Sequence, residues 1–130
     1  MIDDSIVRGH TCKKLVKTFF KAGAKEVHLL ISSPPIRYPD FYGIDIPTRE
    51  ELIAARMSEE EIRKFIGADL LIFQTVDDLS EAIMRRGEHK IDRLSMPYFD
   101  GWYVTGDVNE ASMNAVKEAR TKERGYTEEV

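Results

Sequence analysis

Residues 2–11 read Ile2-Asp3-Asp4-Ser5-Ile6-Val7-Arg8-Gly9-His10-Thr11. This stretch joins a very short apolar segment, ending at Ile2, to an amphipathic pattern over residues 11–22 that predicts a helix. A strand that turns directly into a helix indicates an open α/β sheet. In such sheets ligands bind at the carboxyl ends of the strands. The stretch therefore predicts both the fold class and the place of a binding site.

The rest of the chain continues the alternation of strands and helices. Residues 26–32 are almost continuously apolar, which is typical of a parallel strand covered on both faces, and residues 70–73 form a second apolar run. Capping-box spacings, Thr48 with Glu51 and Ser58 with Glu61, predict helices over residues 48–56 and 58–66. Helices are also expected from residue 75 and over residues 109–124. We predict a mostly parallel sheet flanked by helices, in a single domain over residues 1–130.

Composition narrows the class of protein. The chain has 130 residues, with 19 Lys and Arg against 23 Asp and Glu, so its formal net charge is −4. This balance gives no overall electrostatic reason to bind nucleic acid or an anionic membrane. One cysteine excludes an internal disulfide and any all-cysteine metal site within one chain. The acidic N-terminus is unlike a secretory leader, and no apolar run is long enough to span a bilayer. We therefore expect a cytoplasmic protein.

The residue types in the first stretch point to a phosphorylated sugar. Backbone N–H groups at a helix N-terminus bind anions, and Gly9 allows a close backbone approach. Ser5 and Thr11 add hydroxyl groups, whereas Arg8 either adds charge or faces solvent. The adjacent carboxylates of Asp3 and Asp4 suit ribose hydroxyls or a hydrated Mg²⁺. Two other interpretations stay open: a simple capped loop, and a phospho-acceptor aspartate at a strand end.

The same stretch resembles the phosphoribosyl-pyrophosphate (PRPP) motif of the glutamine amidophosphoribosyltransferase family. The resemblance continues through most of the chain in order, which points to this family rather than to type I phosphoribosyltransferases in general. The further blocks that carry it are Ser32-Ser33-Pro34-Pro35-Ile36-Arg37-Tyr38-Pro39-Asp40-Phe41-Tyr42-Gly43-Ile44-Asp45, Pro47-Thr48-Arg49-Glu50-Glu51-Leu52-Ile53-Ala54, Ile66-Gly67-Ala68-Asp69, Tyr98-Phe99-Asp100-Gly101 and Tyr103-Val104-Thr105-Gly106-Asp107. The resemblance implies a partial type I phosphoribosyltransferase fold, with the ribose-phosphate motif at residues 1–11 and a C-terminal helical tail at residues 107–130.

The resemblance also implies a role for each residue of the motif. Asp3 and Asp4 would hold the ribose 2′- and 3′-hydroxyls and the Mg²⁺ that accompanies PRPP. The 5′-phosphate would lie against the backbone and hydroxyl groups of residues 5–11, namely Ser5, Ile6, Val7, Arg8, Gly9, His10 and Thr11. The family usually has Thr where this chain has His10, so we expect weaker phosphate binding here.

Other family features are not found in the chain. The family's N-terminal glutaminase domain begins with a nucleophilic cysteine, and Cys12 is internal and lies within a predicted helix. The strands before the motif, the pyrophosphate loop and the flexible loop are also missing. Some members hold an iron–sulfur cluster, but Asp40 and Ser95-Met96-Pro97-Tyr98 stand where its cysteines would be, so no cluster is expected.

Two functions follow as expectations. In the first, the chain is the C-terminal fragment of an enzyme that makes phosphoribosylamine from PRPP and glutamine in purine synthesis, and is inactive alone. A separate chain supplying the missing N-terminal part is then an expected partner. In the second, the chain is a non-catalytic module that binds PRPP or a nucleotide monophosphate weakly, or assembles with a partner. Its apolar aromatics Phe19, Phe20 and Tyr98 to Tyr103 also favour self-association, which makes a homo-oligomer an expected state.

Overall fold

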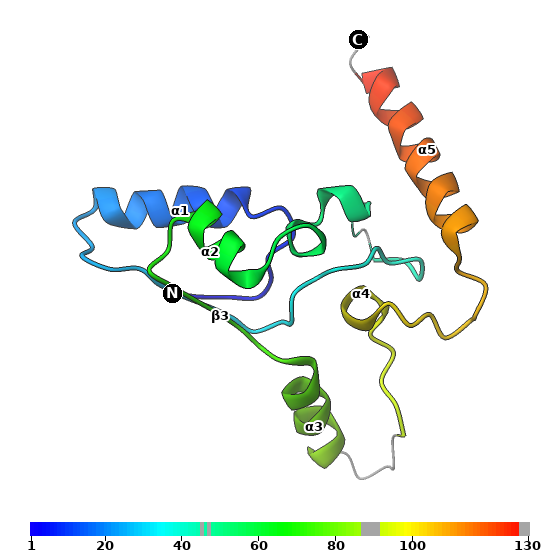
Figure 1. The fold of residues 1–130 in the computed structure, drawn as a ribbon, viewed down its shortest axis with the longest axis horizontal. Helices are drawn as coiled ribbons and strands as arrows, with labels where there is room; N and C mark the ends of the chain where they lie inside the picture. Colours follow the sequence, from blue (N-terminus) through cyan, green and yellow to red (C-terminus); the bar gives the residue numbers. More distant parts are fainter. Residues whose placement is uncertain (45, 47, 87–91, 128–130) are drawn as a thin grey trace.

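The computed structural model describes residues 1–44, 46, 48–86 and 92–127. Its core is a three-stranded parallel sheet in the order β1-β2-β3 (Figure 1). The elements are β1 (Ile2–Asp3), α1 (His10–Lys21), β2 (His28–Ile31), the 3-10 turns η1 (Arg49–Glu51) and η2 (Ile53–Ala55), α2 (Glu59–Ile66), β3 (Leu70–Phe73), α3 (Val76–Arg86), α4 (Pro97–Asp100) and α5 (Glu110–Thr127). The predicted parallel α/β sheet is confirmed. Asp45, Pro47, His89 and residues 128–130 lie outside the described residues.

Both crossover helices of the sheet pack on one side of it (Figure 1). Right-handed crossovers that join neighbouring strands in sequence order, β1 to β2 and β2 to β3, place their helices on the same face. The main core lies between α1, α2 and this face, with Val16, Leu29, Ile62 and Phe73 buried in it. A smaller cluster around Ile36, Ile46 and Leu52 lies under the loop that follows β2.

The expectation that residues 26–32 form a strand covered on both faces is wrong. The strand is shorter, and its side chains alternate: Leu29 and Ile31 are buried, whereas His28 and Leu30 are exposed. Because α1 and α2 lie on the same side, the opposite face has no cover among the described residues. The exposed His28 imidazole lies 3.2 Å from the Glu26 carboxylate.

The predicted helix over residues 48–56 is also wrong, because two short 3-10 turns replace it. The Thr48 side chain makes no capping bond to the backbone and instead donates to the Glu51 carboxylate. The N–H of Ile53 donates to the Val7 carbonyl at 2.9 Å rather than to a preceding turn of helix. This bond ties the segment to the first loop. In contrast, the second capping box, Ser58 with Glu61, forms as predicted at the start of α2.

The segments after β3 extend away from the sheet (Figure 1). The segment between α3 and α5 contains the short helix α4, which begins at Pro97 and ends before Gly101, a residue in the left-handed conformation. Tyr103 is buried, and its hydroxyl donates to the Pro39 carbonyl at 2.7 Å. No helix in the described part of the chain has the length and apolarity that a membrane span needs.

Candidate functional site

A cavity of about 340 Å³ opens where β1 passes into α1, and residues 3–12 line it. Asp3 is the last residue of β1, Asp4 follows it, and α1 begins at His10. The cavity therefore lies at the carboxyl end of a parallel strand and at the N-terminus of a helix. This is the position at which open α/β sheets bind ligands. All nine residues predicted from the sequence lie together around this cavity.

The N-terminus of α1 carries no side-chain cap, and its first turn holds no acidic residue. The starts of α2, α3 and α5 differ, because side chains of Ser58, Thr75 and Asn109 accept backbone N–H bonds there. Uncapped N–H groups at a helix start attract an anion, and the helix dipole adds to the attraction. The start of α1 is thus suited to bind a phosphate group.

Gly9 sets the backbone conformation at the N-terminus of α1. Its φ of +75° lies in the left-handed region, and a Cβ there would stand 2.9 Å from Ile53 Cδ1 and 3.3 Å from Phe65 Cε1. The backbone of the loop therefore packs directly on two apolar side chains from distant parts of the chain. Only glycine fits both the conformation and the space.

The acid pair is fixed by its neighbours. One oxygen of Asp3 accepts from the N–H of Asp4 at 3.0 Å, and the other accepts from the Cys12 thiol at 3.6 Å. The Ser5 hydroxyl donates to Asp4 Oδ2 at 3.0 Å, and this bond is the main reason that the pKa of Asp4 lies below its usual value. The N–H groups of Ser32 and Ser33 donate to the carbonyls of Asp3 and Asp4, both at 3.0 Å. Asp4 is exposed and ionised at neutral pH, so it can accept from sugar hydroxyls or contact a hydrated cation.

The Arg8 guanidinium is paired with a carboxylate and is therefore not free to bind an anion. Its Nε and Nη2 both donate to Glu51 Oε2, at 2.8 Å and 2.5 Å. The sequence left open whether Arg8 adds charge to the site or faces solvent, and the structure shows a third arrangement, an ion pair with η1. No local pattern indicates this pair, since 43 residues separate its members.

His10 and Thr11 lie at the exposed rim. The His10 ring packs edge-on against Phe65, with ring centroids 5.7 Å apart. Thr11 is exposed on the first turn of α1. Cys12, in contrast, is buried, and its thiol faces the Asp3 carboxylate. Burial, together with the Asp3 carboxylate, raises the pKa of its thiol to about 11. Such a thiol stays protonated at neutral pH and is a poor nucleophile.

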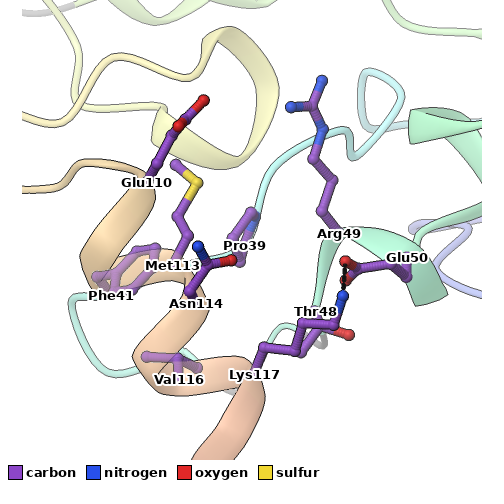
Figure 2. Close-up of a pocket in the computed structure, with 10 residues that line it drawn as sticks. All are labelled: Pro39, Phe41, Thr48, Arg49, Glu50, Glu110, Met113, Asn114, Val116 and Lys117. Carbon is purple, nitrogen blue, oxygen red and sulfur yellow. Dashed lines mark hydrogen bonds and ion pairs between the residues drawn. The ribbon is translucent and has the colours of Figure 1, made fainter.

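A second cavity, of about 350 Å³, lies between residues 39–50 and α5. Figure 2 shows the Glu110 carboxylate and the Arg49 guanidinium on opposite sides of its opening, and Lys117 reaching from α5 to Glu50. That ion pair is 2.5 Å long, and the bond from Lys117 lowers the pKa of Glu50. The α-helix that begins at this cavity, α5, is capped by the Asn109 side chain. The start of α1 has no such cap, so the chemistry favours the cavity at residues 3–12.

Comparison with known proteins identifies the relationship. Amidophosphoribosyltransferase of Pseudomonas aeruginosa is 49% identical over 120 residues, which cover 92% of this chain and 24% of that protein. The Bacillus subtilis enzyme is 48% identical over 119 residues, with 92% and 25% covered. The chain is related to the C-terminal part of the amidophosphoribosyltransferases. It spans about a quarter of the length of these relatives.

The fold supports the same relationship. The structure of glutamine PRPP amidotransferase from B. subtilis, solved with ADP and GMP, superimposes with a TM-score of 0.70 and 50% identity. The superposition covers 80% of this chain and 23% of that one. The resemblance to amidophosphoribosyltransferases is therefore confirmed, and so is the partial phosphoribosyltransferase fold. No family model matches the chain.

Proposed function

We propose that residues 3–11 bind the ribose 5-phosphate group of PRPP or of a nucleotide monophosphate. The observation that carries the proposal is the uncapped N-terminus of α1, which opens into a cavity whose rim holds Asp3 and Asp4. The 5′-phosphate would lie against the N–H groups of the loop and the first turn. The ribose hydroxyls would face the acid pair. The relationship to amidophosphoribosyltransferases supports this assignment.

The acid pair also fits a Mg²⁺ that arrives with PRPP. Mg²⁺ in phosphate sites commonly binds one or two carboxylates and completes its shell with water and substrate oxygens. Among the described residues, no three His, Cys, Asp or Glu side chains gather as a metal site made by protein alone would require. Asp4 would be the main protein ligand, since both oxygens of Asp3 already accept bonds within the chain. When bound, Mg²⁺ would offset the charge of the pyrophosphate group.

In the parent reaction, ammonia released from glutamine displaces pyrophosphate from PRPP and gives phosphoribosylamine. We propose that this chain contributes the ribose-phosphate half of that site and is inactive by itself. Cys12 is its only cysteine, and a buried thiol with a pKa of about 11 cannot serve as the glutaminase nucleophile. The absence of an iron–sulfur cluster stays a prediction, with Asp40 and Ser95 at positions where some relatives have cysteines.

Calorimetric titration with ribose 5-phosphate tests the proposal. Charge-assisted hydrogen bonds contribute about 1.5–3 kcal/mol each, but association costs about 4–15 kcal/mol. We expect a Kd in the millimolar range, which corresponds to about −4 kcal/mol. His10→Thr should bind more tightly, because a hydroxyl replaces a bulky ring that packs on Phe65. Weaker binding by His10→Thr would contradict the assignment, as would equal affinity for ribose and ribose 5-phosphate.

The alternative is a non-catalytic module that binds a nucleotide or assembles with a partner. The two functions predict different outcomes when the rest of an amidophosphoribosyltransferase is added to the chain. A chain that belongs to a catalytic site produces phosphoribosylamine once the rest of an amidophosphoribosyltransferase is supplied. A regulatory module binds ribose 5-phosphate but yields no product in the same mixture.

A further inference from the structure

A further cavity, of about 540 Å³, lies on the exposed side of α1 and adjoins the one at residues 3–12. Four basic residues line it, namely His10, Lys13, Lys14 and Lys17, and we call it the lysine cavity. His10 also lines the cavity at residues 3–12, so the two cavities meet at the first residue of α1. Side chains on a helix lean towards its N-terminus, which brings the lysines closer to this meeting point.

The positive charge of α1 is not balanced within the helix. Its sequence, HTCKKLVKTFFK, holds four lysines and no acidic residue, although the whole chain has a net charge of −4. Among the residues that the structure describes, no carboxylate pairs with Lys13, Lys14 or Lys17. In α2, by contrast, both basic residues pair with Glu60. The lysines of the cavity therefore keep their charge available for an anion from outside the chain.

This placement of charge is unfavourable for the helix by itself. Like charges three or four residues apart, as Lys13 and Lys17 are, repel one another. Cations near the N-terminus of a helix also oppose the helix dipole. An anion bound among the lysines reverses the repulsion and lies at the favourable end of the dipole. The arrangement thus favours a binding site over a merely solvated surface.

The Phe65 ring, from α2, holds two of the lining side chains in place. The Lys13 ammonium lies 4.3 Å from the centre of this ring, and the His10 ring packs edge-on against it. Phe65 itself packs against the main core. Arg8, the single Lys or Arg within residues 3–11, is already paired with Glu51. The positive charge for a further anion therefore comes from α1 rather than from the loop.

We propose that the lysine cavity binds the second phosphate of a ribose 5′-diphosphate group, as found in a nucleoside diphosphate. The proposal rests on the proposed function, in which the 5′-phosphate lies against residues 5–11 and the ribose faces Asp3 and Asp4. A second phosphate, bonded to the first, then extends away from the ribose, past His10, to the lysines. Their ammonium groups donate charge-assisted hydrogen bonds to its oxygens. The pyrophosphate of PRPP is bonded to C1 of the ribose, on the side of the acid pair, and would not enter this cavity.

Uridine mono- and diphosphate (UMP and UDP) test the proposal, because they differ by one phosphate alone. They are titrated calorimetrically without Mg²⁺, which would neutralise the second phosphate, and amide chemical shifts are followed in parallel. We expect UDP to bind about tenfold more tightly than UMP. Both nucleotides should shift the amides of residues 5–11, and UDP should also shift those of residues 13–17.

Two double variants locate the effect. Lys14→Gln combined with Lys17→Gln should lower the ratio of UDP affinity to UMP affinity to about threefold or less. The matched control combines Lys21→Gln with Lys25→Gln, which removes the same charge outside the cavity, and should leave the ratio within about twofold of its original value. All four lysines are exposed, and circular dichroism checks that both variants fold.

Four results would overturn the proposal. Equal affinities for UMP and UDP, with UMP shifting residues 5–11, would exclude the lysine cavity and leave the proposed function intact. An equal fall of the ratio in both double variants would assign the effect to overall charge. UDP shifts on α1 without shifts at residues 5–11 would show that the lysines and the loop do not form one continuous site. If neither nucleotide shifts residues 5–11, the proposed function fails and this inference fails with it.

Discussion

Gly9→Ala tests how tightly the first loop is held against the core. The substitution places a methyl group 2.9 Å from Ile53 Cδ1 at a residue whose φ is +75°. A residue with a side chain costs about 1–2 kcal/mol in the left-handed region. Forcing extra volume into a packed site costs about 1–3 kcal/mol more. We expect the free energy of unfolding to fall by about 2–5 kcal/mol, measured by urea denaturation.

Gly67→Ala is the matched control for this substitution. Gly67 also has a positive φ, +83°, but a Cβ there would meet no atom within 4 Å. Its cost should be the backbone part alone, about 1–2 kcal/mol. The difference between the two variants measures the contact of the loop with Ile53 and Phe65. If Gly9→Ala destabilises the chain no more than Gly67→Ala does, the loop is not packed as described.

Two further predictions concern stability. Burial and the Asp3 carboxylate raise the pKa of Cys12 from its ordinary 9.0 to about 11, so the folded state keeps a proton that the unfolded state loses. The free energy of unfolding should therefore fall as pH rises from 9 towards 11. Cys12→Ala should lessen the change of the urea midpoint between pH 8 and pH 10. If that change is the same in the variant, the Cys12 thiol is not buried beside Asp3 as described. Ser58→Ala removes the side chain that accepts the Glu61 N–H at 3.3 Å and should cost about 1 kcal/mol in thermal or urea unfolding. A loss below about 0.2 kcal/mol would show that the capping box does not stabilise α2.

The sequence predicts the parts of this fold that depend on local patterns. α2 combines a capping box, apolar residues at helical spacing and a terminal glycine, and it forms as expected. The stretch around Gly9 has the composition of an anion-binding turn, and it does lie between a strand and a helix. The capping-box spacing, which predicts α2 correctly, predicts a helix wrongly at Thr48 and Glu51. There the Ile53 N–H bonds to Val7, 46 positions earlier in the chain, and a helix cannot form.

Long-range contacts explain what the sequence does not show. The Arg8–Glu51 pair, the Cys12–Asp3 bond and the packing of Phe65 on Gly9 join segments whose spacing follows no pattern. The open face of the sheet is a further case. An apolar strand such as residues 28–31 has the same sequence whether or not a second layer covers it. Only the arrangement of α1 and α2 on one side shows which face the described residues leave uncovered.

Amide chemical-shift titration shows residue by residue whether the loop at residues 5–11 binds a 5′-phosphate. Ribose 5-phosphate is added to the isotope-labelled chain, with ribose alone as the control. We expect the largest shifts at the amides of residues 5–11, smaller ones at Asp3 and Asp4, and no comparable shifts with ribose. Shifts centred on the cavity between residues 39–50 and α5, or equal shifts with ribose, would contradict phosphate binding at residues 5–11.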